Sequence, residues 1–396
     1  MKLSRSICSA LVLPALFLSP PPADAAVPVT AQTEPMLLTG NPSDNADRAD
    51  DVCVWVDPRD PSHSVLIGVN KSDNGIDGGL YAFDFDGNRA LNVGSWIEGV
   101  NLFEKGERYN NVDIRYGVQA GTRKWDLVCA SNRSDREIDV FRVKRNAAGS
   151  FAGLELVGEV ELGSGFAGGT AAPYGLGMFQ PRSTDRTYVL TSDKEGKVAQ
   201  YRLLFDASGS GQDRIRGTRV GQVFDVSRNG SEVEGIVGDD EKGVIYIAAE
   251  DRGIYRYNTD DQGVLRTGGR VTVATPRSDA ELTADVEGLT LYHTRDGGGY
   301  LIASSQGNST YAVYDRSFQG TSKNAFIKSF SISGVQNTDG LDVCSANLGG
   351  DFTSGALIVH DGKGDRPTRY KLVKWEDVAE EGSTDLEIDT RWDPRP

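Results

Sequence analysis

Six times along the chain, a run of apolar residues ends in polar residues and is followed by a second run that is rich in Tyr or Phe. The six first runs begin at positions 65, 127, 188, 244, 301 and 357, so they recur every 56 to 62 residues. Short apolar runs that are bounded by polar and Gly-containing turns predict strands rather than helices. The pattern therefore predicts six copies of one unit built from strands.

A repeat of this kind also predicts how the units pack. One small sheet cannot bury its faces alone, so repeated sheets stack against their neighbours around a central axis. We therefore expect an all-β protein, a six-bladed β-propeller over residues 46–396. Because a division of this stretch would interrupt the repeat, we expect a single domain. A closed ring gives no reason for association, so we expect a monomer.

The N-terminus carries a different pattern. Lys2 and Arg5 precede an apolar stretch at positions 7–18, and small residues follow at Ala23 and Ala25. This order is typical of a secretory signal peptide, and the apolar stretch is too short to span a bilayer. We expect residues 1–25 to be a signal peptide and residues 26–45 a linker. The mature protein is then exported, to the periplasm or outside the cell, without a membrane anchor.

Composition narrows the class of partner. The chain has 396 residues, of which 38% are hydrophobic, and a formal net charge of −15. The apolar share is that of a globular protein, and the excess of acid argues against nucleic acid as a partner. Beyond the signal peptide, Cys53, Cys129 and Cys344 each follow a Val in an apolar run. We expect three buried, small apolar side chains. The alternative is a Cys53–Cys344 disulfide, if the first and last blades meet.

A second repeat places one polar residue at the beginning of a short strand, as in ADDVCVWV, EVEGIVGD and NTDGLDVC. The innermost strands of a propeller all run the same way along the axis, so equivalent positions ring one mouth of the channel. Carboxylates that crowd together need a cation between them, and oxygen ligands favour calcium, whereas zinc prefers His or Cys. The six positions are Asp51, Asn111, Tyr174, Glu234, Glu287 and Asp339.

Three consecutive first runs end in a cation, at Lys71, Arg133 and Lys194, whereas the other three end in acid or amide groups. A mouth with cations on one side and a metal site on the other suits a ligand that carries several negative charges, because Arg and Lys both bind phosphate oxygens. The alternative interpretation is that these three cations form ordinary ion pairs between neighbouring blades.

Longer motifs carry a family resemblance. They run in one order through all six units: ADD-x-x-x-W-x-DP-x-x-P (49–61), NNVDIRYG (110–117), ASNRS (130–134), KEG-x-x-x-QY (194–201), EG-x-x-x-DDE (234–241), YIAAED (246–251), LTADVEGLT (282–290), ASSQGNS-x-YA (303–312) and TDG-x-DV (338–343). On these motifs the chain resembles the β-propeller phytases, a six-bladed, calcium-dependent family. The resemblance extends from residue 47 to the terminal DPR.

The resemblance implies an activity and its residues. It implies a 3-phytase-type phosphoric monoester hydrolase that binds several Ca²⁺ ions and acts on phytate (myo-inositol hexakisphosphate) or calcium-phytate. A metal-activated water would attack phosphorus, without a covalent enzyme intermediate. The implied substrate-binding residues are Lys71, Arg133, Tyr174 and Lys194, and the implied catalytic residues are these four with Glu234 and Glu250. The implied calcium ligands are Asp50, Asp51, Tyr174, Glu234, Glu250, Asp285, Glu287, Gln306 and Asp339.

The chain departs from the best-known relatives at four places. Ser72 stands where they have a second Lys, Ala172-Pro173 precede Tyr174 in place of an acid and Val, and Ala249 replaces the first of two Glu residues. The stretch at 332–337 is shorter and lacks one Asp.

Two other functions fit part of the pattern. A calcium-dependent lactonase-type propeller hydrolase would also carry acids on the axis, but it would not need the three cations. A non-enzymatic propeller would bind polyphosphates or a protein and leave its ligand unchanged.

Overall fold

The computed structural model of the chain describes residues 26–36, 47–72, 78–87, 107–163, 166, 172–207, 214–227, 230–277, 279, 281–362, 364 and 367–395. The signal peptide predicted at 1–25 and residues 37–45 of the predicted linker lie outside the described residues. Strands dominate the described part, so the prediction of an all-β protein is confirmed. Within the described residues, no helix is long and apolar enough to cross a membrane.

The strands fall into six antiparallel groups that follow the repeat read from the sequence. The innermost strands are β2 (Ala49–Trp55), β5 (Tyr109–Ala120), β9 (Leu176–Phe179), β13 (Val233–Asp239), β17 (Val286–His293) and β21 (Leu341–Cys344). The second strands are β3 (Val65–Asn70), β6 (Arg123–Asn132), β10 (Thr187–Ser192), β14 (Val244–Ala249), β18 (Gly299–Ser305) and β22 (Ala356–Asp361). The third strands are β4 (Gly79–Phe83), β7 (Glu137–Arg145), β11 (Lys197–Asp206), β15 (Gly253–Asn258), β19 (Thr310–Asp315) and β23 (Arg369–Lys374).

Outer strands complete five of the groups: β8 (Phe151–Glu161), β12 (Arg214–Asp225), β16 (Val271–Ala274), β20 (Phe326–Ser331) and β1 (Ala31–Gln32). β1 comes from the N-terminal segment and pairs antiparallel with β23, so the first described strand completes the last group. Short 3₁₀ helices lie at η1 (Pro61–His63) and η4 (Gln306–Asn308), and α1 (Trp375–Ala379) follows β23. The third and fourth groups form one eight-stranded sheet, because β9 and β13 share a single parallel bridge between Leu176 and Gly235.

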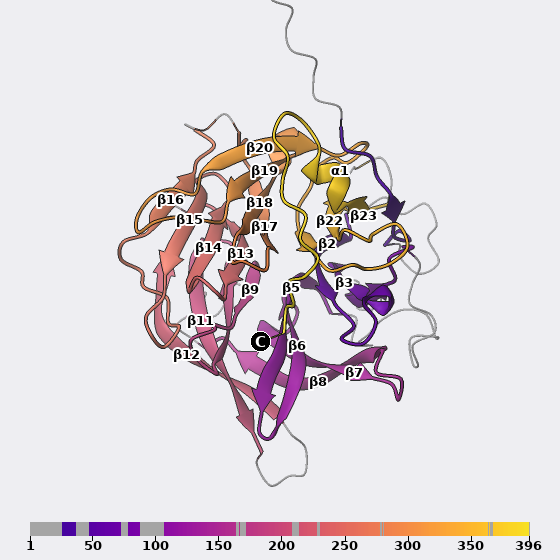
Figure 1. The fold of residues 1–396 in the computed structure, drawn as a ribbon. Helices are drawn as coiled ribbons and strands as arrows, with labels where there is room; N and C mark the ends of the chain where they lie inside the picture. Colours follow the sequence, from indigo (N-terminus) through magenta and orange to yellow (C-terminus); the bar gives the residue numbers. More distant parts are fainter. Residues whose placement is uncertain are drawn as a thin grey trace, which may run out of the picture.

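The innermost strands contact one another in cyclic order. β2 lies against β5, β5 against β9, β9 against β13, β13 against β17, β17 against β21, and β21 against β2. In Figure 1, β5, β9, β13 and β17 lie around the middle of the molecule, whereas β12, β16 and β20 lie at its rim. The six groups are therefore arranged with their first strands facing a common centre.

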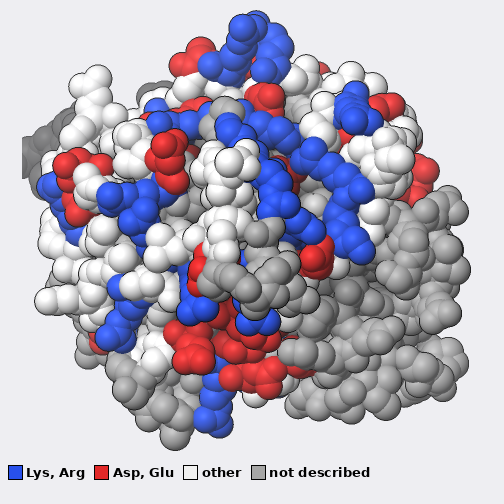
Figure 2. Space-filling view, turned by 90° about the horizontal axis from the view of Figure 1, so that it is seen from below, with Lys and Arg blue, Asp and Glu red and all other residues white. Residues whose placement is uncertain are grey.

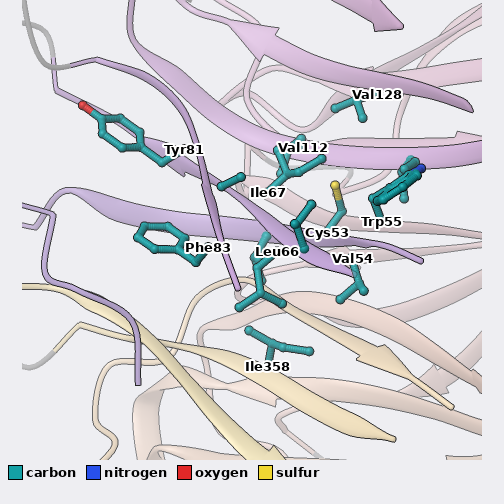
Figure 3. Packing of buried hydrophobic residues seen from close by; sticks show 14 of the residues in the cluster. Cys53, Val54, Trp55, Leu66, Ile67, Tyr81, Phe83, Val112, Val128 and Ile358 are labelled. Carbon is teal, nitrogen blue, oxygen red and sulfur yellow. The ribbon is translucent and has the colours of Figure 1, made fainter. Parts of the chain in front are cut away.

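Packing between neighbouring groups explains the continuous apolar runs. Every residue of β3, β10, β14 and β22 is buried, because each of these strands has a sheet on both faces. Figure 3 shows how residues from different groups meet: Ile67, Val112 and Ile358 converge in one cluster with Cys53. Cys53, Cys129 and Cys344 are buried and free, so they are the small apolar side chains that we expected, and the alternative Cys53–Cys344 disulfide is wrong.

The C-terminal segment crosses the middle of the molecule, as the yellow chain in Figure 1 shows. Trp392 stacks on His293 of β17 with ring centroids 4.3 Å apart. Arg395 donates to the carbonyl of Val56 and to Asp126. These contacts fasten the fifth group to the first two. They lie over a cavity of about 110 Å³ that β5, β13, β17 and β21 line.

The surface is mixed in sign. The face in Figure 2 carries basic and acidic side chains side by side, with one compact group of acidic residues between basic neighbours. Neither sign covers this face, so the charges of its described residues are interspersed.

Candidate functional site

A cavity of about 520 Å³ lies where the innermost strands of all six groups begin. Nine residues singled out from the sequence line it: Asp50, Lys71, Arg133, Tyr174, Lys194, Glu234, Glu287, Gln306 and Asp339. They come from all six groups of strands, so residues that are far apart in the sequence share one cavity. Four of the six repeat positions line the cavity, namely Tyr174, Glu234, Glu287 and Asp339, whereas in the first two groups the preceding residues Asp50 and Asn110 line it instead of Asp51 and Asn111.

Glycine makes this convergence possible. A Gly follows each of four repeat positions, in the pairs Tyr174-Gly175, Glu234-Gly235, Glu287-Gly288 and Asp339-Gly340. A Cβ on Gly235 would lie 2.2 Å from the carbonyl oxygen of Glu287, and one on Gly340 would lie 2.3 Å from the Asp51 carboxylate. Only Gly lets neighbouring backbones come this close. The polar side chains that precede these glycines are therefore brought together.

Three glutamates form a compact group of acids, and two of them, Glu234 and Glu287, line the cavity. One carboxylate oxygen from each of Glu234, Glu250 and Glu287 lies within 4.8 Å of the others. Burial, followed by the charge of Asp50, raises the pKa of Glu234 well above its ordinary value. Burial and the charge of Glu234 do the same to the pKa of Glu287. The pKa of Glu250 is raised to about 8 by burial and by other carboxylates nearby.

These glutamates fit a bound divalent cation. Glu250 Oε1 and Glu287 Oε2 are buried and have no hydrogen-bond partner among the described residues. Unpartnered carboxylate oxygens that face one another are costly unless a cation lies between them. A donor set made only of oxygens suits Ca²⁺ or a similar hard ion. The prediction of a metal site is thus compatible with this geometry.

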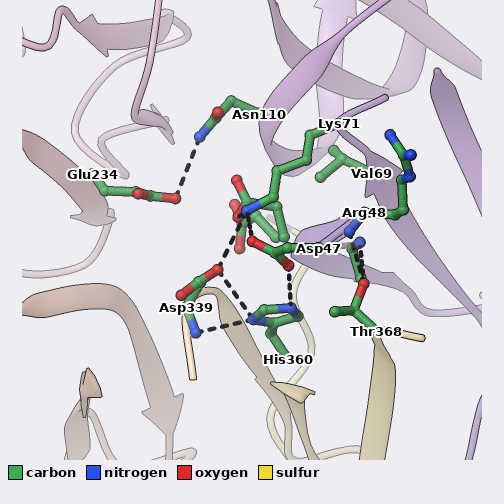
Figure 4. Close-up of polar contacts among 12 residues, drawn as sticks. Asp47, Arg48, Val69, Lys71, Asn110, Glu234, Asp339, His360 and Thr368 are labelled. Carbon is green, nitrogen blue, oxygen red and sulfur yellow. Dashed lines mark hydrogen bonds and ion pairs between the residues drawn. The ribbon is translucent and has the colours of Figure 1, made fainter. Parts of the chain in front are cut away.

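Lys71 lies beside the acids from the first and last groups. Its Nζ is 2.7 Å from Asp50 Oδ1, 2.6 Å from Asp47 Oδ2 and 3.5 Å from Asp339 Oδ2, as Figure 4 shows in part. Burial alone would lower the pKa of Lys71, but these carboxylates outweigh it and raise the pKa well above its ordinary value. Burial raises the pKa of Asp50 to about 6 although Lys71 opposes this. The lysine is therefore charged and held in place.

Arg133 and Lys194 both lie close to one aromatic ring. Lys194 Nζ is 4.2 Å from the ring centre of Tyr174, and the Arg133 guanidinium carbon is 5.7 Å from it. Arg133 also donates to Asn110 Oδ1 at 3.0 Å, and Lys194 pairs with Glu232 at 2.5 Å. Both cations border the cavity and are less buried than Lys71. Burial, followed by the charge of Arg108, lowers the pKa of Arg133.

Asp339 is the most constrained acid of the site. Gln306 Nε2 donates to its Oδ1 at 2.5 Å, and His360 Nδ1 lies 3.1 Å from its Oδ2. Burial would raise the pKa of Asp339, but His360 and Lys71 outweigh it and hold the pKa below its ordinary value. The contact with Asp339 likewise outweighs burial at His360 and raises the histidine pKa to about 10.

Three of the predicted ligands, Asp51, Glu250 and Asp285, are not part of the cavity lining. Asp51 is buried, and its Oδ2 accepts hydrogen bonds from Asn111 Nδ2 and from the backbone N–H of Val112, both at 3.1 Å. It therefore joins β2 to β5. Asp285 lies just before β17, where burial and then the charges of Asp251 and Glu232 raise its pKa. Of the departures, Ser72 is fully buried and receives a hydrogen bond from Arg48, so it does not line the cavity.

The cavity is also lined by four residues for which no role was predicted: Asp47, Arg108, Asn110 and Asn337. Asn110 donates to Glu234 Oε1 at 3.3 Å while it accepts from Arg133, so it links an acid to a cation. It belongs to the NNVDIRYG motif, which was the available signal. Asp47 and Asn337 lie in loops without a repeat position, and the pattern of the sequence had no means of placing them.

Comparisons with known proteins point to one family for the whole chain. A family model described as Phytase matches residues 2–396. The 3-phytase of Bacillus subtilis (strain 168) is 32% identical over 365 residues, which cover 89% of this chain and 85% of that protein. Among solved structures, an α-L-arabinanase of Penicillium chrysogenum complexed with arabinobiose has a TM-score of 0.50 and 12% identity, covering 89% of this chain and 99% of that chain. This last likeness concerns the fold alone.

Proposed function

Because the chain belongs to the phytase family and is a 3-phytase-type hydrolase, we propose that it hydrolyses the phosphate monoesters of myo-inositol hexakisphosphate in a calcium-dependent reaction. The proposed substrate is phytate or its calcium complex. The proposed nucleophile is a metal-activated water, and no covalent enzyme intermediate forms.

One observation carries this proposal. Glu234 and Glu287, two members of the glutamate cluster with Glu250, line the same cavity as the cations Arg133 and Lys194. Phytate carries many negative charges, so it needs both a cation-binding wall and fixed positive side chains. The volume of about 520 Å³ is in the range of small-molecule sites.

The architecture that we propose is a six-bladed β-propeller. The cyclic contacts of the six innermost strands support it, and so does the pairing of β1 with β23, which joins the N-terminal segment to the last blade. A ring closed in this way leaves few exposed strand edges, so the proposed state is a monomer. We also propose export to the periplasm or the medium, which rests on the signal sequence alone.

Each side chain has a proposed part in the reaction. Bound calcium would supply charge neutralisation and a coordinated water of lowered pKa. Glu234, Glu250 and Glu287 would hold it, together with Asp50, Asp339 and Gln306 on the neighbouring wall. Arg133 can bind two phosphate oxygens through parallel hydrogen bonds, and Lys194 adds a point charge.

The remaining residues orient these groups. Tyr174 lies close to both Arg133 and Lys194, and its ring would help to orient the two cations. Lys71 is paired with Asp47 and Asp50 in this structure, so it contributes its charge from a fixed position. Fixed cations stabilise the phosphoryl transition state because its charge spreads over the oxygens.

The direct test measures phosphate released from sodium phytate by purified protein, with CaCl₂ and with EDTA. We expect release with calcium and almost none with the chelator. A protein that binds phytate but releases no phosphate under either condition would be a binding propeller, and the proposed function would be wrong.

A variant separates a phytase from another calcium-dependent hydrolase. R133A should lower kcat/KM for phytate about 100-fold, the usual effect of removing one preorganised donor to a transition-state oxyanion. The matched control is R142A, because Arg142 pairs with Glu155 on β7 and β8, outside the cavity lining. Full activity in R133A would contradict phosphate binding by this cation.

A further inference from the structure

His360 lies directly behind the wall of the candidate site. It belongs to the end of β22, and its side chain is 1% exposed. Its Nδ1 faces Asp339 and lies 3.1 Å from the carboxylate Oδ2 and 3.2 Å from the backbone nitrogen of that residue. Its Nε2 faces Asp47, 3.4 Å from Oδ1. Figure 4 shows the imidazole between these two acids.

The histidine also connects two segments of backbone. Its own N–H donates to the carbonyl of Gly340 at 3.0 Å, so main chain and side chain both fasten the loop before β21. That loop carries Asp339 but belongs to no strand, because β21 begins at Leu341. Without the contacts to His360, the loop would lack the ladder of hydrogen bonds that fixes the other acids of the site.

The two contacted acids differ in how firmly they are held. The Asp339 side chain is 9% exposed and also accepts from Gln306. The Asp47 side chain is 50% exposed, and within the described part of the chain its ion pairs are with Lys71 and His360. Both acids line the cavity beside Lys71. One imidazole therefore fixes one buried and one half-exposed carboxylate at the same wall.

We propose that His360 is a positioning residue, which holds Asp339 and Asp47 at the orientation needed to bind calcium and phytate. This inference rests on the proposed function. An imidazole suits the task because its two nitrogens point in opposite directions, so a single rigid ring can hydrogen-bond to two carboxylates at once. Groups that orient metal ligands in this way typically change metal affinity or activity by 10–100-fold when they are removed.

The test compares H360L and H360N with the wild type. Leu fills similar space but donates no hydrogen bond. Asn places an amide near the position of Nδ1, so it keeps the contact with Asp339 and loses the one with Asp47. The matched control is H293L, because His293 is also largely buried but lies at the other end of β17 from Glu287. Six residues along a strand separate the two by about 20 Å.

Calorimetry of CaCl₂ binding to each protein gives a readout that does not depend on turnover. We expect H360L to bind calcium about 10–100-fold more weakly than the wild type, H360N to lie between them, and H293L to match the wild type. In phytate hydrolysis at saturating calcium, H360L should lower kcat more than it changes KM, because its misplaced acids disturb the reacting phosphate rather than the whole ligand.

Calcium binding by H360L that equals that of the wild type would overturn the inference. If H360L does not fold, H360N decides, because wild-type calcium affinity in H360N would overturn the inference and a weaker affinity would support it. The proposed function fails separately, since it predicts calcium-dependent phosphate release by the wild type, whatever the histidine variants do.

Discussion

Replacing Glu250 by Gln should have opposite effects on the calcium-free and the calcium-bound protein. In the absence of metal, Glu250 shares its surroundings with Glu234 and Glu287, with oxygens within 4.8 Å. Two ionised carboxylates at this distance repel each other by about 3.5 kcal/mol at an effective dielectric constant of about 20. An uncharged amide removes this repulsion, so E250Q should stabilise the fold in chelator.

The magnitude follows from the titration of the same group. The pKa of Glu250 is raised from 4.5 to about 8 by burial and then by Glu232 and Asp285. A difference of this size corresponds to about 4–5 kcal/mol of unfavourable ionisation above pH 8. Because the side chain is partly exposed, solvent screening reduces the expected gain to roughly 2 kcal/mol. That is roughly 3 °C in Tm for a chain of this length.

In the presence of calcium, E250Q should lower stability instead of raising it, because the substitution removes an ionised ligand of the metal. We expect calcium affinity to fall at least about tenfold, or about 1.4 kcal/mol. The assay is thermal unfolding at pH 9 in EDTA and in CaCl₂, together with calorimetry of calcium binding. E155Q is the control, because Glu155 is exposed and pairs with Arg142 on a distant blade. A Tm in EDTA that does not rise in E250Q, or an unchanged calcium affinity, would refute the interpretation of the cluster as a metal site.

Three further outcomes are expected. Because the pKa of Glu250 is raised in the fold, the folded protein binds more protons than the unfolded chain between about pH 4.5 and 8, so calcium-free stability should decline as pH rises through that window. The increase in Tm produced by CaCl₂ should grow across the same window. Calorimetric scans from pH 5 to 9 would check both expectations. R316M should destabilise the protein by about 3–5 kcal/mol in urea unfolding. The fully buried Arg316 makes two hydrogen bonds to Asp239, at 2.6 and 2.7 Å, and without the arginine the buried Asp239 carboxylate has lost that partner. A loss of stability below about 1 kcal/mol would contradict this. W392A should cost about 1–2 kcal/mol through the lost stack on His293 and leave phytate hydrolysis unchanged, since this contact lies away from the candidate site; a selective loss of kcat would show that the C-terminal segment affects the reaction.

Much of the fold could be predicted because a strand that is buried on both faces must consist mainly of apolar residues, which form a continuous run in the sequence. The apolar runs beginning at Val65 and Val244 coincide with the first residues of β3 and β14. The run read from position 188 lies inside β10 (Thr187–Ser192), one residue from its beginning. Patterns of this kind depend only on neighbours in the sequence.

The candidate site was harder to predict from the sequence than the fold. The repeat identified Glu234, Glu287 and Asp339 as equivalent positions, and the structure brings all three to one cavity. The repeat could not show that Asp51 directs its carboxylate at Asn111 and Val112, since that contact depends on how the first two sheets approach each other. It also could not find Asp47, which has no repeat position. His360 stands at the end of the sixth first run, but the repeat could not show that its ring contacts Asp339 and Asp47.

The sequence by itself determined that this is an all-β protein of repeated units in the phytase family, because periodic burial and long motifs are properties of local order along the chain. Only the tertiary structure decided which groups meet: that Lys71 lies 3.5 Å from Asp339 of the last group, and that the cysteines stay free. The physical reason is that such contacts join different sheets, whose separation is set by how closely backbones pack at glycines such as Gly235 and Gly340. No local pattern encodes a distance between groups that are hundreds of residues apart.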